Sequence, residues 1–152
     1  MDKLLVGWRE WVALPGLNIN KIKAKIDTGA RTSALHAFFV EPFDENGQKM
    51  VRFGVHPVQK RLDIEIICQC PIKDYRQVRD SGGHQELRYV IETPLKLGER
   101  VWPVEMTLTN RDNMKFRMLL GRTAMRGMAV FPDQSYLFGR PDSKFGMKEG
   151  SL

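Results

Sequence analysis

The segment that most constrains this chain is 21–26, in which polar and apolar residues alternate directly before Asp27-Thr28-Gly29. Strict alternation is typical of a half-buried β-strand, because successive side chains point to opposite faces of a sheet. We expect this strand to carry the Asp27 carboxylate out of the sheet at a tight turn. Gly29 would allow close approach of a second backbone, and the Thr28 hydroxyl would fix the turn. An Asx-turn without further function is the simpler explanation.

The other apolar stretches are short, rich in Val, Ile and Phe, and separated by Gly, Pro and Asn. This pattern predicts an all-β protein. We expect hairpins over 38–55, turning at Asn46-Gly47, and over 75–92, and a short helix over 123–127. In the strand expected over 61–70, Leu62, Ile64 and Ile66 share one face. Further strands are expected over 8–14, 99–109, 115–120 and 131–138.

Length and composition bound the function classes. A chain of 152 residues has room for one core, so we expect a single domain over 1–141 and a flexible polar tail over 142–152. No apolar run approaches the roughly 20 residues that span a bilayer, and the start lacks the apolar core of a secretory signal. Cys68 and Cys70 are too close for an easy disulfide, which favours the cytoplasm. The net charge of +6 favours anionic partners.

A second motif, Met118-Leu119-Leu120-Gly121-Arg122, follows late in the chain. Together with 26–30 it resembles the two hallmarks of retropepsin-like aspartic peptidases. In that family the apolar-apolar-Gly strand lies beneath the catalytic turn and buries it. The resemblance implies a closed retropepsin-like (acid protease) barrel with a short C-terminal helix. Gly82-Gly83 is similar to the family's flap, and the long spacing from Gly29 implies an inserted segment over 38–78 that contains a hairpin.

The segment 26–37 narrows the resemblance, together with Arg79, Ser81, Gly82, Arg88 and Val90. These residues resemble a bacterial and archaeal retropepsin-like family whose members carry the label ATP-dependent zinc protease. Its members tend to be associated with ATP-grasp ligases that add glutamates to a ribosomal protein. The resemblance implies trimming of glutamate-extended protein tails, with a glutamate ligase as a candidate partner.

Amide hydrolysis by this route needs two carboxylates that share a proton, one acting as base toward water and the other as acid. One chain supplies one such turn, so we expect an aspartic endopeptidase that works as a homodimer with paired Asp27 residues. Asp80-Ser81-Gly82 matches the motif by letter, and a pair of Asp27 with Asp80 within one chain is the alternative.

The predicted catalytic residues are Asp27, Thr28 and Gly29. The predicted substrate contacts are Ala30, Arg31, Gly82, Gly83, Arg88 and Arg122. Guanidinium groups bind carboxylates in a bidentate manner, so these arginines suit an acidic peptide or glutamylated tail. In many retroviral enzymes an Asp occupies the place of Arg31 and pairs with the second-hallmark Arg, so Arg122 would be free for substrate. Alternatively, the arginines are solvated or paired with Glu86, Glu92 and Glu105.

We expect no cofactor and no metal. There is no His-Glu-x-x-His, and the spacing of the remaining candidates is not that of a usual zinc site: these are His36, His56, Cys68, Cys70 and His84. His36 is instead expected to be a structural hydrogen-bonding residue. No phosphate-binding loop of the Gly-x-x-x-x-Gly-Lys type is present, so any ATP dependence would belong to a partner.

The alternative function is a catalytically inactive retropepsin-fold binding module for an anionic peptide or nucleic acid. Nucleic acid is disfavoured because the basic residues of the first alternating strand lie on one face, as a solvated side would: Lys21, Lys23 and Lys25.

Overall fold

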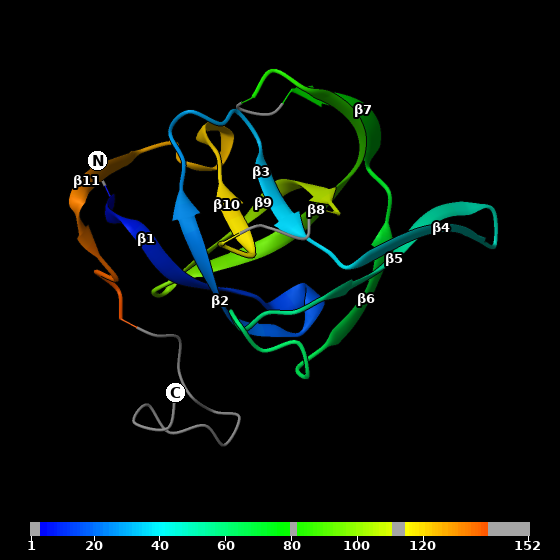
Figure 1. Ribbon diagram of the computed structural model, residues 1–152, viewed down its shortest axis with the longest axis horizontal. Coiled ribbons are helices and arrows are strands. Elements are labelled where there is room, and N and C mark those ends of the chain that lie inside the picture. The colour runs from blue at the N-terminus through cyan, green and yellow to red at the C-terminus, as the bar shows by residue number, and fades with distance from the viewer. Residues whose placement is uncertain (1–3, 80–81, 111–114, 140–152) are drawn as a thin grey trace.

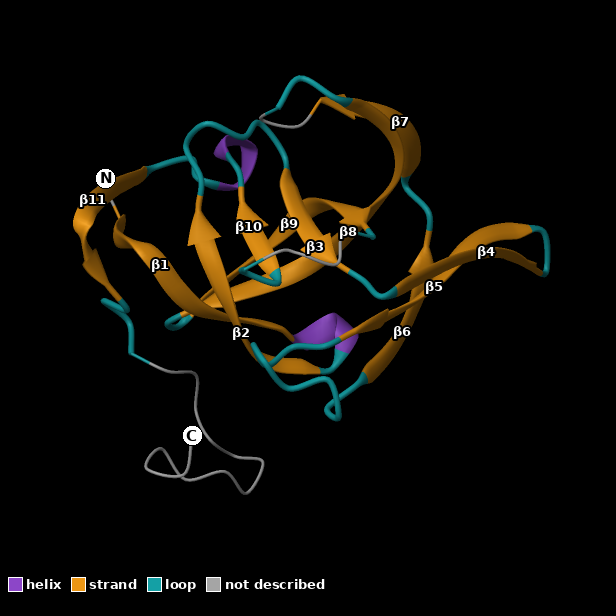
Figure 2. Cartoon of the chain, in the orientation of Figure 1, coloured by secondary structure: helices purple, strands orange, loops and turns teal. Residues whose placement is uncertain are grey.

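The computed structural model describes residues 4–79, 82–110 and 115–139 (Figure 1). The expected tail and the Asp80-Ser81 pair lie outside the described residues. Within them the chain forms strands and two single-turn 3₁₀ helices (Figure 2). The strands are β1 (Leu4–Leu14), β2 (Ile19–Ile26), β3 (Ser33–His36), β4 (Phe39–Glu45), β5 (Gln48–Val55), β6 (Ile66–Pro71), β7 (Asp74–Arg79), β8 (Gln85–Leu97), β9 (Arg100–Thr109), β10 (Met118–Leu120) and β11 (Met128–Ser135); the 3₁₀ helices are η1 (Pro15–Leu17) and η2 (Arg122–Ala124).

Eight strands form one sheet in the order β11-β1-β2-β10-β3-β9-β8-β7. Ala13 of β1 also pairs with Lys96 of β8. This contact joins β1, β2, β10, β3, β9 and β8 into a ring, as in a small barrel whose interior is filled by side chains. The prediction of an all-β, retropepsin-like barrel is therefore confirmed.

The strand expected over 21–26 is present within β2, and its alternation matches its burial. Ile22, Ala24 and Ile26 are buried in the barrel core, whereas Lys25 is exposed. Apolar side chains that leave water in this way supply most of the favourable free energy of folding. The same core contains Leu35 of β3 and residues of β1, β8, β9 and β10.

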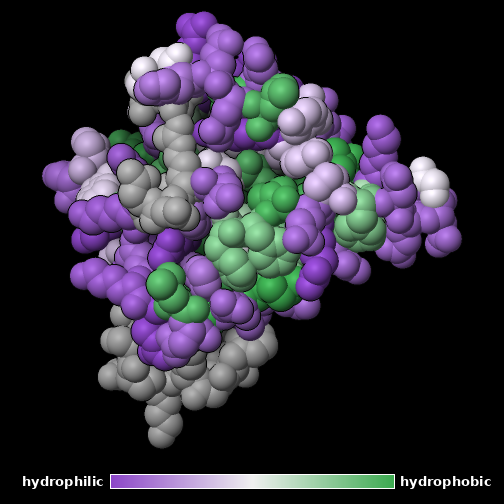
Figure 3. Space-filling model, turned by 45° about the vertical axis from the view of Figure 1, so that its right-hand side comes forward, coloured by the Kyte–Doolittle hydropathy of each residue, from purple (hydrophilic) through white to green (hydrophobic). Residues whose placement is uncertain are grey.

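Most of the predicted inserted segment 38–78 forms a separate three-stranded sheet, β4-β5-β6, whereas its last residues, 74–78, belong to β7 of the eight-stranded sheet. Its β4–β5 hairpin projects to the right of the barrel in Figure 1. The turn has positive φ at Asn46 (52°) and Gly47 (83°), the signature of a type I′ hairpin turn, so this prediction is confirmed. Figure 3 shows hydrophobic residues gathered in the middle of this side of the molecule, framed by hydrophilic ones. Large apolar side chains exposed on these elements and their neighbours include Ile67, Tyr75 and Leu87.

Other predicted boundaries are wrong. The strand expected over 61–70 begins only at Ile66, and Leu62 is 64% exposed. Before it, the Arg61 N–H donates to the Val58 carbonyl at 3.2 Å, which makes a turn. The strand expected over 115–120 shortens to β10, and the helix expected over 123–127 is the 3₁₀ helix η2. The last strand starts three residues early because Met128 pairs with Leu4 of β1.

One buried carboxylate joins the two ends of the described chain. Glu10 of β1 is 0% exposed. Its Oε2 accepts the N–H groups of Gly7 at 2.7 Å and Leu137 at 3.0 Å, and its Oε1 accepts that of Phe138 at 3.4 Å. Burial of a charged group is costly unless its hydrogen bonds are satisfied. Glu10 therefore stabilises the segment after β11 against β1.

Candidate functional site

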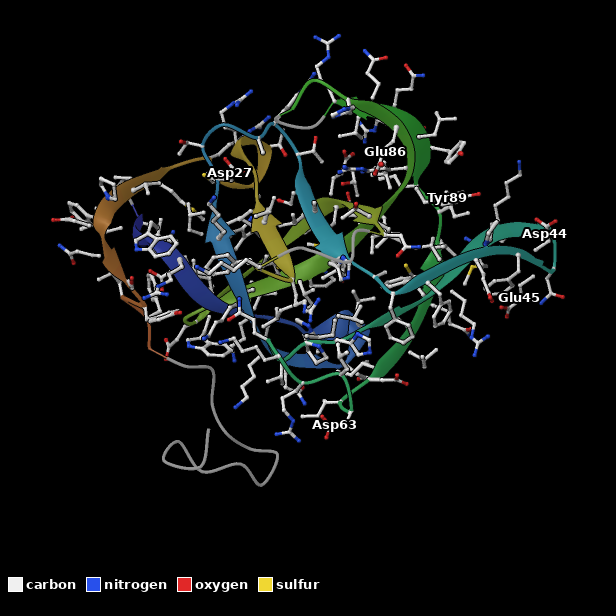
Figure 4. The ribbon with its side chains drawn as sticks, viewed as in Figure 1. Asp27, Asp44, Glu45, Asp63, Glu86 and Tyr89 are labelled. Atoms are coloured by element: carbon white, nitrogen blue, oxygen red, sulfur yellow. The ribbon has the colours of Figure 1, made fainter. Side chains whose placement is uncertain are left out.

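The position of Asp27 is set by the pairing of two strands that end together. β10 runs parallel to β2, with Leu120 opposite Ile26, and the Asp27 N–H donates to the Leu120 carbonyl at 2.9 Å. Figure 4 shows Asp27 at the end of β2. Its Oδ1 accepts the Gly29 N–H at 3.0 Å, which is an Asx-turn. The carboxylate is half-buried and holds its own turn, while Thr28 and Gly29 are exposed.

Gly121 of the second motif lies directly against the loop that follows the turn. A Cβ at this position would sit 2.6 Å from the carbonyl carbon of Thr32 and 2.9 Å from the Ser33 nitrogen. The Gly121 N–H donates to Ser33 Oγ at 3.0 Å. Only glycine fits this approach of two backbones. The glycine of the second motif is thus explained by packing between the β2–β3 loop and the end of β10.

Two of the predicted arginines lie at this loop: Arg31 is part of it, and Arg122 contacts it from η2. The Arg122 N–H donates to the Ala30 carbonyl at 2.8 Å, and the next N–H, of Thr123, donates to the Arg31 carbonyl at 2.9 Å. Arg122 Nη1 also donates to the Thr28 carbonyl at 3.0 Å. Arg122 therefore stabilises the turn. The sequence predicts that its side chain is free for substrate, whereas one of its donors already binds the Thr28 carbonyl. Both Arg31 and Arg122 are exposed, and each has guanidinium donors that an anion can reach.

Arg88 does not face solvent. Its side chain is 8% exposed, and its Nε donates to Glu86 Oε1 at 2.6 Å, so the alternative of pairing with a glutamate is the arrangement found. Its Nη1 lies 3.4 Å from Thr107 Oγ1, which in turn donates to the Ser33 carbonyl at 3.2 Å. Figure 4 places Glu86 on the upper side of the barrel. Thr107 thus connects Arg88 to Ser33 at the start of β3.

Gly82 and Gly83 lie at the exposed end of the β7–β8 hairpin. Gly83 has φ 83°, a conformation that favours glycine. Arg79 is the last residue of β7 and is exposed. In the view of Figure 1 this hairpin end and the β2–β3 loop lie at the same end of the molecule. The alternative pair of Asp27 with Asp80 falls outside the described residues.

Ser33 and Thr107 contact this network, although the sequence does not mark them as site residues. They come from β3 and β9 and are 74 positions apart. Both are buried. No local pattern joins residues at such a separation, because their contact depends on the parallel pairing of β3 with β9. The glutamate that pairs with Arg88 is Glu86, two residues earlier on the same strand, β8, so this pair is local in the sequence.

The residues considered for zinc are not gathered into a site. Among the described residues, no group of three or more His, Cys, Asp or Glu side chains could hold a metal ion. Cys68 and Cys70 are free thiols. Burial, then the charge of Cys70, raises the pKa of Cys68 to about 12, and burial raises the pKa of Cys70 to about 11. His36 is buried on β3, and the His56 ring stacks on Phe38.

Comparison with known proteins identifies the family. The model described as "RimB-like: Retropepsin-like aspartic endopeptidase RimB" matches residues 5–141. A probable alpha-L-glutamate ligase of Parasynechococcus marenigrum (strain WH8102) is 48% identical over 138 residues, which are 90% of this chain and 30% of that protein. A probable alpha-L-glutamate ligase of Shewanella pealeana is 44% identical over 139 residues, 91% of this chain and 30% of the relative. The chain spans about 30% of the length of these curated relatives.

A solved structure has the same fold. It is protein Lpg0085 of unknown function (DUF785) from Legionella pneumophila, with a TM-score of 0.73 and 26% identity. The match covers 89% of this chain and 98% of that one. The likeness therefore extends over nearly the whole of both chains.

The names of the curated relatives correct the predicted activity. The relatives are named as ligases, which form bonds, whereas the sequence predicts an aspartic endopeptidase, a hydrolase that trims glutamate-extended tails. The prediction is wrong because one fold hosts many chemistries, and the Asp27 turn is first a structural feature of this barrel. The homodimer and the roles of single residues stay predictions.

No described helix is long and apolar enough to cross a membrane. The chain belongs to the RimB-like family of retropepsin-like proteins.

Proposed function

We propose that this domain serves glutamate ligation by binding the acidic polypeptide to which glutamate is added. The observation that carries the proposal is the match itself. Relatives named probable alpha-L-glutamate ligase contain a region 44% to 48% identical to about 90% of this chain. An enzyme that extends a polypeptide with glutamate has to hold a chain whose negative charge grows with each addition. A basic domain of +6 net charge suits that task.

The Asp27 turn offers the contacts that such a polypeptide needs. Arg31 and Arg122 are exposed on either side of it, and guanidinium groups bind carboxylates through two parallel hydrogen bonds. Arg122 is already held by its bond to the Thr28 carbonyl, so it loses less side-chain freedom on binding. The half-buried Asp27 carboxylate is an acceptor for a backbone N–H of the bound chain. The two guanidinium groups favour a polypeptide with acidic side chains over one with basic side chains.

The proposal is tested by fluorescence anisotropy with a labelled hexaglutamate peptide. Arg31→Glu and Arg122→Glu should each weaken binding by about tenfold or more, because a charge-assisted hydrogen bond is lost and a repulsion is gained. Arg52→Glu is the matched control, since Arg52 is also exposed but lies on the inserted sheet. Binding should also weaken as salt rises.

Two outcomes would contradict the proposal. Equal binding of hexaglutamate and hexalysine would show that the acidic chain is not recognised. Equal losses in Arg31→Glu, Arg122→Glu and the Arg52→Glu control would show that net charge alone, rather than the loop, attracts the peptide. Mass spectrometry of the recovered peptide checks that it stays intact during the measurement.

A further inference from the structure

A groove of about 540 Å³ is lined in part by Thr123 and Ala124 of η2. Two of its lining residues are arginines and none is acidic. Its lining consists of Leu4, Arg100, Val101, Trp102, Pro103, Thr123, Ala124, Arg126 and Met128. A groove with cationic groups above apolar walls matches the charge of an acidic polypeptide better than that of a basic or neutral one.

One wall of the groove is the free edge of β9. Four consecutive residues, 100–103, line it. Successive side chains of a strand point to opposite faces, so four in a row line the same groove only along the strand's edge. β3 pairs with β9 only from Met106 onward. Within the described chain, the first half of β9 therefore has β8 on one side and the groove on the other.

The register of β9 with β8 tells which backbone groups face the groove. Pro103 lies opposite Pro94, and neither proline has an N–H, so the two cannot form a hydrogen-bonded pair. In an antiparallel ladder the backbone groups of such a residue point away from its partner strand. Val101, two residues earlier, has the same orientation. The groove edge thus offers the N–H and C=O of Val101 and the C=O of Pro103.

The opposite wall comes from η2 and the residue that follows it closely, Arg126. Arg100 and Arg126 are both exposed, and Val101 is 55% exposed. η2 begins at Arg122, which binds the Thr28 carbonyl. The same single-turn helix therefore contacts the Asp27 turn through Arg122 and lines the groove through Thr123 and Ala124.

We propose that an extended acidic polypeptide segment docks in this groove as a short added strand on β9. Its backbone pairs with Val101, and its carboxylates bind Arg100 and Arg126. Pro103 limits the pairing to a few hydrogen bonds, because it has no donor for a longer strand. The inference rests on the proposed function for the class of ligand, an acidic polypeptide, and adds a second binding site for it.

Hydrogen exchange and anisotropy together test the groove, again with hexaglutamate peptide. Exchange of the Val101 amide should slow when the peptide is added, and the double variant Arg100→Glu/Arg126→Glu should bind the peptide at least tenfold more weakly. The exposed Lys96 of β8 gives a matched control, Lys96→Glu, which should change affinity far less.

The results separate failure of the groove from failure of the proposed function. If Arg31→Glu weakens binding while the Arg100/Arg126 variant and Val101 exchange are unchanged, the groove proposal is overturned and the proposed function stands. If the peptide does not bind the unaltered chain at all, both fall. If Val101 becomes protected at high protein concentration without peptide, a second copy of the chain fills the groove, which also overturns the proposal.

Discussion

Glu10→Ala should strongly destabilise the barrel, because it removes the acceptor of one buried and two partly buried backbone donors. Two N–H groups, of Gly7 at 2.7 Å and Leu137 at 3.0 Å, would lose a charge-assisted hydrogen bond, and that of Phe138 a weak one at 3.4 Å. Each buried donor left without a partner costs about 1–3 kcal/mol. The two close bonds together amount to roughly 2–6 kcal/mol. Removal of the carboxylate also relieves its own desolvation cost, so we expect a net loss of about 2–4 kcal/mol.

Glu10→Gln separates the role of charge from that of shape. Glutamine keeps one carbonyl oxygen, which can still accept the two close N–H groups. Its amide NH₂ would then face the Phe138 N–H, where no acceptor remains. The variant should therefore lose about 1–2 kcal/mol, less than the alanine variant.

Urea denaturation followed by tryptophan fluorescence measures both variants. With a slope of about 2 kcal/mol per molar urea, Glu10→Ala should move the midpoint down by roughly 1–2 M. Glu99→Ala, at an exposed position in the β8–β9 turn, is the control and should change stability by less than about 0.5 kcal/mol. Equal midpoints for Glu10→Ala and Glu99→Ala would refute the reasoning that Glu10 stabilises the C-terminal segment.

Three further predictions concern single residues of the site and the inserted sheet. Gly121→Ala should lower the stability measured by thermal unfolding by about 3 kcal/mol, because the new Cβ would meet rigid backbone. The control Gly29→Ala should cost less than about 1 kcal/mol, because its Cβ meets only a side-chain oxygen at 3.3 Å. Similar costs for the two variants would contradict this. Stability should fall as pH rises above about 9, because unfolded thiols ionise near 9.0, whereas the folded-state pKa values of Cys68 and Cys70 are about 12 and 11. Unfolding measured across this pH range checks the prediction. Cys68→Ala should flatten the dependence of stability on pH. Arg88→Met should lower the free energy of unfolding in urea by about 1–3 kcal/mol; the loss is limited because the side chain of its partner, Glu86, is 43% exposed. A stability equal to that of the unaltered chain would count against a stabilising role for the contacts of Arg88 with Glu86 and Thr107.

Local patterns predicted the fold where a strand's own alternation decides its structure. The alternating residues of β2 and the Asn46-Gly47 turn both encode their conformation within a few positions, through burial of one face and through positive φ. The alternation of Leu62, Ile64 and Ile66 misled for the same reason. It suits a strand, but β5 pairs with β6 only over Ile66–Pro71, so Leu62 stays exposed and Ile64 is half-buried without joining the strand.

The activity was the part that pattern predicted wrongly. The Asp27 turn and Gly121 are explained by backbone packing between β2, β3 and β10, and that packing is needed whatever the domain binds. A motif that the fold itself requires cannot by itself specify a reaction. The names of the relatives, rather than the motif, favour glutamate ligation.

By itself, the sequence determined the all-β class and the alternating strand that leads into the Asp27 turn, because each depends on residues close together in the chain. Only the tertiary structure decided that Glu10 is buried beneath the C-terminal segment and that the Arg88 guanidinium is buried beside Thr107 of β9. It also decided that, among the described residues, no second strand pairs with the first half of β9 beside Arg100 and Arg126. The physical reason is that a buried charge and an open strand edge are both defined by distant partners, and ring closure brings those partners together or leaves them apart.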